Sequence, residues 1–356
     1  MHDAQTPADS PEAVLTQALA WCDAGRGVAL ATVVQTWSNA PQRAGSLLAV
    51  EASGAVCGAV AGGTVQAQVV AAAREVIADG QLRTLTLNVS DELAMGAGLA
   101  CGGDLVLRVE ALAPAAPATT LLRDALLALQ RRRGVVLCTR LADQRQMLIA
   151  VDEAADTELS VEALRAAAAD ATRVASIEGE PVLFQVFNPP LRLVIVGAVH
   201  IAQALVPAAR LVGFAATVID PRPGFATAER FPGAEVAGGD VALALRVAAL
   251  DRRCAVVALS HQAEIDDPAL SKALHSRAFY VGALGSRKTQ KARLERLQAA
   301  GLPAPVAARL HGPAGLAIGA SGPAEIAASI VAEMIAVLRG QHARSATQLA
   351  APPDAS

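Results

Sequence analysis

The sequence predicts an α/β protein: a C-terminal domain built on a parallel sheet, preceded by a smaller α+β domain. Two observations carry this prediction. From residue 191 onward, short apolar runs alternate with segments of helical periodicity, a pattern typical of a parallel sheet covered on both faces. In residues 1–113, alternating strand-like runs are joined by turns rich in glycine and proline.

The expected N-terminal domain spans residues 1–113, followed by a linker and middle α/β segment over 114–190. The first domain should contain helices over 11–24 and 65–78, the second capped by Thr64, and strands over 28–34, 46–50, 56–60, 82–88 and 104–110. After a linker at 114–119, the middle segment should contain helices over 121–130 and 161–169 and strands over 135–140, 146–151 and 182–187.

The expected C-terminal domain spans residues 191–340, and residues 341–356 are expected to be a disordered tail. Its strands are predicted at 193–196, 215–219, 255–259 and 278–281, and its helices at 201–211, 288–298 and 323–338. Gly197 follows the first strand, and Asp220 ends the second strand 23 positions later. This spacing is that of a dinucleotide-binding βαβ unit, so the domain is predicted to be Rossmann-like.

The glycine fingerprint of that unit is incomplete. Val199 stands at its second glycine, which normally lets the backbone approach a pyrophosphate, and Ala202 stands at the third. A plain NAD dehydrogenase is therefore not the first expectation. Asp220 is either the ribose ligand or a cap on the strand end, and Arg222 could bind a phosphate.

Composition narrows the class of protein. The chain has 356 residues and a net charge of −3, which argues against nucleic acid or an anionic membrane as the main partner. The N-terminus lacks the pattern of a signal peptide, and no apolar run is long enough to span a bilayer, so we expect a cytoplasmic protein. The basic run at residues 131–133 is interpreted as a solvated helix end.

The five cysteines form no Cys-x-x-Cys pair, which argues against a disulfide framework and a zinc site. Cys57, Cys138 and Cys254 lie in apolar runs and are expected in the core. Cys101 instead precedes Gly102 and Gly103 in a glycine-rich turn. Its thiol could contact a ligand, or it could be a small buried side chain.

Two segments of the N-terminal domain have the composition of anion sites. Gly62, Gly63 and Thr64 precede a helix, whose free N–H groups and dipole favour negative charge. The loop at 42–46 adds the guanidinium of Arg43 and the hydroxyl of Ser46. The alternative interpretation is a tight turn beside a surface arginine.

Further candidates follow strands of the parallel sheet, at the edge where ligands bind in such folds. His200 lies in the first turn, either as a ligand contact or in a structural role. Three more glycine-containing or polar loops predict a crevice for an extended anionic ligand; they contain His261, then Gly282, Gly285, Ser286 and Arg287, and then residues 311–320. No nucleophile elbow, metalloprotease helix or P-loop is present.

Taken together, these segments resemble the XdhC/CoxI family, the accessory proteins that mature xanthine dehydrogenase and related molybdenum hydroxylases. The resemblance covers nearly the whole chain. It lies in the segments Val196–Ala202, Val218–Arg222, Phe225–Pro232 and Tyr280–Arg287 of the C-terminal domain, and in Thr32–Trp37, Ala40–Pro41, Gly45–Ser46 and Gly98–Gly103 of the N-terminal one.

The resemblance implies a carrier rather than an enzyme, with no catalytic acid–base pair. The cargo would be the molybdenum cofactor, as molybdopterin or its cytosine dinucleotide form, protected during sulfuration by a cysteine desulfurase and passed to an apo-xanthine dehydrogenase or related hydroxylase. Accessory factors of this size often act as dimers, so a homodimer is a further expectation, although nothing in the sequence fixes its interface. Two alternatives stay open: an NAD(P)-dependent oxidoreductase using Asp220 at the ribose, and a non-catalytic assembly scaffold.

One motif departs from the family pattern. The family has Gly-Gly-Cys-Val-Glu where this chain has Gly62-Gly63-Thr64-Val65-Gln66. If the missing cysteine normally meets the metal or a sulfur, Cys101 is the remaining candidate for that contact. Loss of this cysteine bears more on a role in sulfuration than on binding of the cofactor.

Overall fold

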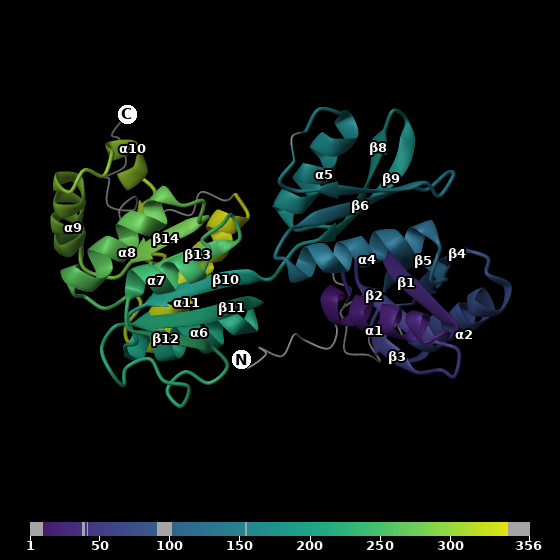
Figure 1. Ribbon diagram of the computed structural model, residues 1–356, viewed down its shortest axis with the longest axis horizontal. Helices are drawn as coiled ribbons and strands as arrows, with labels where there is room; N and C mark the ends of the chain where they lie inside the picture. The colour runs from purple at the N-terminus through teal and green to yellow at the C-terminus, as the bar shows by residue number, and fades with distance from the viewer. Residues whose placement is uncertain (1–9, 38–39, 41, 91–101, 154, 341–356) are drawn as a thin grey trace. The chain divides into compact units, whose positions relative to one another are not determined.

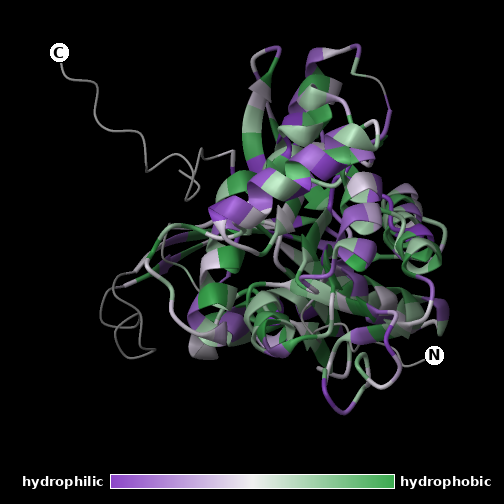
Figure 2. Cartoon of the chain, turned by 90° about the vertical axis from the view of Figure 1, so that its left-hand side faces the viewer, coloured by the Kyte–Doolittle hydropathy of each residue, from purple (hydrophilic) through white to green (hydrophobic). Residues whose placement is uncertain are grey.

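The computed structural model describes residues 10–37, 40, 42–90, 102–153 and 155–340, and these residues form two compact units. The chain passes from the N-terminal unit to the C-terminal unit at Pro189–Pro190. Figure 2 shows green and purple residues mixed along the helices, as expected of helices with one apolar face. Each unit has its own clusters of buried apolar side chains.

The first part of the N-terminal unit is an antiparallel sheet with strand order β3-β2-β1-β5-β4. Its elements are α1 (Pro11–Asp23), β1 (Val28–Gln35), β2 (Leu47–Glu51), β3 (Val56–Gly58), α2 (Gly63–Asp79), β4 (Arg83–Val89) and β5 (Gly103–Leu112). Helix α1 packs on one face through Val14 and Leu15, and α2 packs on the other through Val69 and Val76. This sheet is thus covered on both faces.

The second part of this unit is a smaller antiparallel sheet with strand order β7-β6-β9-β8 (Figure 1). Its elements are α4 (Pro117–Gln130), β6 (Val135–Arg140), β7 (Gln146–Ala150), α5 (Glu158–Ala169), β8 (Arg173–Ile177) and β9 (Glu180–Phe187). Leu126 and Leu129 of α4 share a core with α1 and with β6, so one helix serves both sheets. The other face is covered by α5.

The C-terminal unit is a six-stranded parallel sheet with order β12-β11-β10-β13-β14-β15, which confirms the predicted Rossmann-like fold. Its elements are β10 (Leu191–Val196), α6 (His200–Leu211), β11 (Phe214–Asp220), β12 (Glu235–Gly238), α7 (Val241–Val247), β13 (Cys254–Ala258), α8 (Ala263–His275), β14 (Tyr280–Ala283), α9 (Arg287–Ala299), α10 (Ala304–Ala307), β15 (Leu310–His311) and α11 (Pro323–Leu338). Helices α6 and α11 cover one face and α7 and α8 the other.

Three local expectations from the sequence are wrong. Gly62, not Thr64, is the N-cap of α2, because the helix begins two residues earlier than the hydroxyl pattern indicates. The segment predicted as a linker ends at Ala116, since Pro117 opens α4 as the first helical residue, where its missing N–H costs nothing. Cys57 is half-buried on the short strand β3 rather than in the core.

Candidate functional site

One edge of the first sheet collects the N-terminal motifs. The end of β1 lies beside the start of β2, because the N–H of Val33 donates to the carbonyl of Ser46 at 2.9 Å. Gly103, the first residue of β5, pairs with Val89 and contacts Trp37, which follows β1. The end of β3 leads from this edge into α2. Segments far apart in sequence thus meet at one sheet edge.

The N-terminus of α2 is open at this edge. Gly62, Gly63 and Thr64 are all exposed, and Gly62 has no side chain with which to cap the helix. Within the described residues, the N–H groups of Gly63 and Thr64 have no hydrogen-bond acceptor. Free N–H groups at the positive end of a 17-residue helix attract an anion.

Three buried polar atoms near the edge have no hydrogen-bond partner among the described residues: Thr36 Oγ1, Trp37 Nε1 and Gln66 Oε1. Thr36 and Trp37 follow β1, and Gln66 lies in the first turn of α2. Buried polar groups are nearly always hydrogen-bonded in folded proteins, so this concentration is unusual. Two hydrogen-bond donors and an acceptor are therefore left for a water or a ligand.

Arg43 and Ser46, the cation and hydroxyl predicted to bind an anion, differ in whether their side chains are already engaged. The Arg43 side chain is exposed, and no ion pair or hydrogen bond holds it within the described residues. The Ser46 hydroxyl instead donates to Gln42 Oε1 at 3.1 Å. Gly45 has a φ of +91°, and a Cβ there would lie 2.4 Å from Thr172 Oγ1. Gly45 therefore packs closely against Thr172, while Arg43 has no partner in the described part of the chain.

The two glycines after Cys101 serve packing. A Cβ on Gly102 would lie 1.8 Å from the carbonyl oxygen of Val89, and one on Gly103 would lie 2.7 Å from Trp37 Cβ. These contacts account for both glycines without a ligand. Cys101 itself, proposed as the sulfur or metal contact, lies outside the described residues.

The second candidate edge is the carboxyl end of the parallel sheet, where β10 and β13 lie side by side while their following helices cover opposite faces. Gly197 follows β10 with a φ of +106°, and a Cβ there would lie 2.5 Å from the backbone nitrogen of Ser260. Only glycine fits between these two loops. Val199 is the N-cap residue of α6 and offers no side-chain hydrogen bond.

Asp220 is fully buried, with an exposed fraction of 0%. Its carboxylate accepts hydrogen bonds from the N–H of Ala198 at 2.7 Å and from the Arg222 backbone and guanidinium. Burial raises the pKa of this carboxyl, but the hydrogen bonds outweigh burial and the pKa lies below its usual range. The Arg222 guanidinium also stacks 4.1 Å from the Phe225 ring centre. Asp220 thus offers no exposed surface to a ribose.

His200 and His261 are both exposed at this edge, at the start of α6 and after β13. Gly282 lies inside β14, where a Cβ would meet the Tyr280 ring at 2.7 Å, so it is not part of the turn. The turn proper contains Gly285, with a φ of +140°, and Ser286, which caps α9 by accepting from the N–H of Thr289 at 3.2 Å. Arg287 opens that helix and is exposed.

A buried ion pair behind these loops was missed from the sequence. The Asp266 carboxylate accepts from the Ser260 hydroxyl at 2.6 Å and lies 3.4 Å from the guanidinium of Arg293. Burial raises the pKa of Asp266 and lowers that of Arg293. Arg293 also donates to the carbonyl of Leu284 at 3.1 Å, and so the pair connects the loops after β13 and β14.

A second buried group holds the loop that precedes α11. The Glu333 carboxylate accepts from the Tyr280 hydroxyl at 2.6 Å and from the N–H of Gly315 at 2.7 Å, and it lies 3.1 Å from His311 Nδ1. Burial beside this carboxylate raises the pKa of Tyr280 well above its usual range. Glutamate inside an apolar helix is the signal that sequence reasoning overlooked.

Two features are absent from the described residues: a cluster of three or more candidate metal ligands, and a long apolar helix. None of their His, Cys, Asp and Glu side chains gather in threes as a metal site would require. None of their helices combines the length and apolar character of a membrane span.

The fold defines a class: a Rossmann-type C-terminal unit following an N-terminal unit of two antiparallel sheets, with a candidate ligand edge in each unit. Family models match both units. The XdhC Rossmann domain matches residues 193–334, and the XdhC and CoxI family model matches residues 21–88. The chain belongs to the XdhC and CoxI family.

Individual relatives agree with this membership. The chain is 26% identical to the molybdenum cofactor insertion chaperone PaoD of Escherichia coli, over 92% of this chain and 89% of that protein. It is also 26% identical to a probable xanthine dehydrogenase subunit of Bacillus subtilis, over 86% and 92% of the two chains. A crystal structure described as a xanthine dehydrogenase from Bacillus halodurans matches with a TM-score of 0.67 and 25% identity, over 96% of this chain and 99% of that one.

Proposed function

We propose that this protein binds the molybdenum cofactor and delivers it to an apo-xanthine dehydrogenase or a related molybdenum hydroxylase. The similarity to a molybdenum cofactor insertion chaperone supports the class of cargo. The observation that carries the proposal is the convergence at the first sheet edge of an open helix N-terminus, Arg43 and three buried polar atoms, all without hydrogen-bond partners among the residues that the structure describes. A carrier needs such binding groups and no catalytic acid–base pair.

The chemistry of this edge fits the cargo. Molybdopterin combines a phosphate with a hydrogen-bonding pterin. The N–H groups of α2 and the Arg43 guanidinium suit the phosphate. Trp37 Nε1 and Gln66 Oε1 are a donor and an acceptor for the pterin edge. Gly62, Gly63, Thr64 and Ser46 complete the proposed binding set, together with Gly102 and Gly103 beside Trp37.

The sulfuration role and the cysteine desulfurase partner are further parts of the proposal. Thr64 supplies no thiol at the exposed start of α2, where the family motif has cysteine. Cys101 is therefore the proposed sulfur or molybdenum contact, and the glycines that follow it place its chain neighbour Gly102 at the same edge.

Cofactor content is the direct test. The full chain is purified from a molybdenum-replete host, oxidised, and assayed for the fluorescent pterin product and for molybdenum. We expect about one pterin per chain, lost in Cys101→Ala and reduced at least about tenfold in Arg43→Glu. Arg26→Glu is the matched control, since Arg26 is exposed at the opposite end of β1. Absence of pterin from the parent, even after incubation with free cofactor, would leave the assembly scaffold or the NAD(P)-dependent oxidoreductase as the explanation, and NAD(P) titration would then distinguish the two.

The carboxyl edge of the parallel sheet is the proposed site for a nucleotide part of the cofactor. We propose that a cytosine dinucleotide form would use the carboxyl edge of the parallel sheet, where Gly197, His200, Arg222, His261 and the Gly285–Arg287 turn lie. Release of cytidine monophosphate on hydrolysis of the bound cargo would identify that form. The alternative NAD(P)-dependent oxidoreductase predicts NAD(P) binding by calorimetry, which the buried Asp220 and Val199 disfavour.

A further inference from the structure

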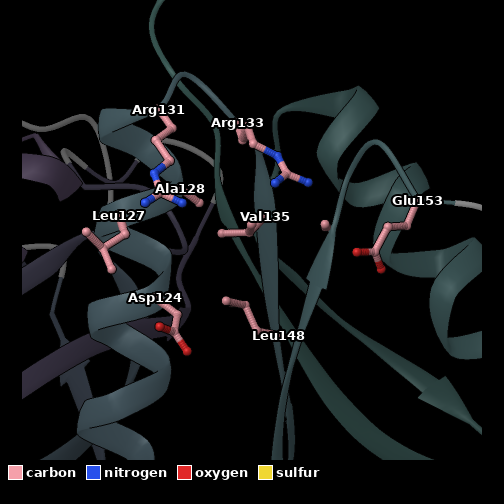
Figure 3. Close-up of a pocket in the computed structure, with 9 residues that line it drawn as sticks. Asp124, Leu127, Ala128, Arg131, Arg133, Val135, Leu148 and Glu153 are labelled. Atoms are coloured by element: carbon pink, nitrogen blue, oxygen red, sulfur yellow. The ribbon is translucent and has the colours of Figure 1, made fainter.

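A concave surface in the N-terminal unit lies between α4 and the edge strand β7, away from the motifs discussed above (Figure 3). It encloses about 310 Å³. Both apolar and charged side chains line it. The lining residues that matter here are Leu127 and Ala128 of α4, Leu148 and Ala150 of β7, and the charged Asp124 and Arg131.

The exposed face of the C-terminal half of α4 carries an acidic residue, Asp124, and a basic residue, Arg131, that is the C-cap of the helix. Asp124, Leu127, Ala128 and Arg131 are spaced by three, four and seven positions and so lie on one face. Leu127 is 43% exposed, a high value for a large apolar side chain. Asp124 and Arg131 have no ion-pair partner among the described residues. They stand about 10 Å apart along the helix axis.

This charge pattern is its own complement. The midpoint between Asp124 and Arg131 falls between Leu127 and Ala128. A two-fold axis through that midpoint brings Arg131 of a second copy opposite Asp124, and Asp124 of that copy opposite Arg131. Leucine meets leucine at the centre. Isologous dimers are built on such self-complementary patches.

The strand beside this face is also unpaired. The N–H of Val151 donates to the carbonyl of Gly134, and that of Arg140 to the carbonyl of Arg145, which sets the register between β6 and β7. The alternate N–H groups, those of Leu148 and Ala150, therefore point away from β6. In the described part of the chain these two N–H groups have no acceptor. An open edge of this kind is a template for another strand.

The two features agree in spacing. Helix α4 contacts both β6 and β7, and Figure 3 shows it running alongside these strands. If two β7 strands pair at about 4.8 Å, a helix that lies over the gap between β6 and β7 is about 5 Å from the two-fold axis. The two α4 helices are then about 10 Å apart, which is the packing distance of helices. Strand pairing and helix packing can therefore form together.

We propose that two copies of this chain associate through β7 and the exposed face of α4, extending the four-stranded sheet of each copy across the two-fold axis. This pairing names a surface for the homodimer that is expected of an accessory factor of this size. It does not involve the sheet edge at the N-terminus of α2, where the cofactor is proposed to bind. A monomeric protein would therefore contradict this pairing and leave the proposal of cofactor binding unaffected.

The test is sedimentation equilibrium of the full chain. We expect a concentration-dependent dimer. Asp124→Arg and Arg131→Asp should each raise its dissociation constant about tenfold or more, because each places like charges opposite one another at both of the symmetry-related contacts. An equimolar mixture of these two variants should recover the dimer, because the heterodimer has complementary charges at both contacts. Arg132→Asp is the control; Arg132 is exposed and lies outside the concave surface.

Ala150→Pro tests the strand component, since proline removes an outward N–H and leaves the bonds to β6 intact. We expect it to weaken the dimer while the far-ultraviolet circular dichroism and the pterin content stay unchanged. A monomer at all concentrations up to about 100 μM overturns the proposal. So does a mixture of charge variants that gives no heterodimer, or an Arg132→Asp variant as weak as Arg131→Asp.

Discussion

The Asp220 carboxylate accepts a hydrogen bond from the backbone N–H of Ala198 at 2.7 Å, across 22 residues of sequence. The contact ties the end of β11 to the turn after β10. Arg222 donates to both oxygens of the same carboxylate: its guanidinium reaches Oδ2, which also accepts from Ala198, at 2.6 Å, and its Nε and backbone N–H each reach Oδ1 at 2.9 Å. The residue that a dinucleotide fold commonly offers to a ribose serves here to fix the turn, and Arg222 would have to move before a hydroxyl could reach it.

Replacing Asp220 by asparagine should destabilise the protein at neutral pH by about 2–3 kcal/mol, because a charged acceptor of buried hydrogen bonds is lost. The folded-state pKa of Asp220 lies below its usual range, so its contribution is complete above about pH 4 and is lost as the pH falls through the folded value. Thermal unfolding from pH 7 to pH 3 should thus show a shallower decline for Asp220→Asn. Parallel declines would contradict this assignment.

Glu333 should control the loop before α11. Glu333→Gln keeps the size of the side chain but weakens three contacts to a buried carboxylate, and we expect a loss of about 2 kcal/mol or more. Tyr280→Phe should cost less, about 1–2 kcal/mol, since the carboxylate keeps Gly315 and His311. Hydrogen exchange at the Gly315 amide is the specific measurement. Its protection should fall in Glu333→Gln, and an unchanged rate would show that the loop is held by other contacts.

The sequence predicted the parallel sheet well because its strands are continuous apolar runs that follow the rules of a doubly wound fold. Gly197 was identified correctly as the first turn, and its close approach to Ser260 explains why no other residue fits. Short strands with weak patterns, such as β8 and β12, were not predicted. Their residues are only half-buried, so their periodicity is faint.

The candidate site was harder to predict because its hydrogen bonds and ion pairs join residues that are far apart in the sequence. No local pattern shows that Asp266 pairs with Arg293, or that Glu333 bonds to Tyr280 from 53 residues away. The polar atoms of Thr36, Trp37 and Gln66 that find no partner among the described residues are likewise recognised only once the strands are placed in register. Motif glycines were found from sequence, but their packing role at Gly102 and Gly103 was not.

Gly103 and Gly62 should respond differently to the same substitution. Gly103→Ala places a Cβ 2.7 Å from Trp37 Cβ, so Trp37 or the start of β5 must shift. Gly62→Ala meets no atom within 4 Å and has a φ of −103°, which alanine adopts freely. We expect Gly103→Ala to lower Tm by several degrees, corresponding to about 1–3 kcal/mol, and to change the emission of Trp37 in a Trp21→Phe background. Equal Tm values for the two variants would argue against this packing.

Thr64→Cys should create a reactive thiol. Position 64 is exposed in the first turn of α2, where the unsatisfied N–H groups and the helix dipole stabilise a thiolate. We therefore expect its pKa to lie below the ordinary value of about 8.5. Thr86→Cys is the matched control, since Thr86 is exposed on strand β4, far from a helix end. The pH dependence of alkylation, followed site by site by mass spectrometry, measures both thiols. A midpoint at position 64 that is equal to or above that at position 86 would show that this helix N-terminus does not favour an anion, and would remove one support of the proposed cofactor edge.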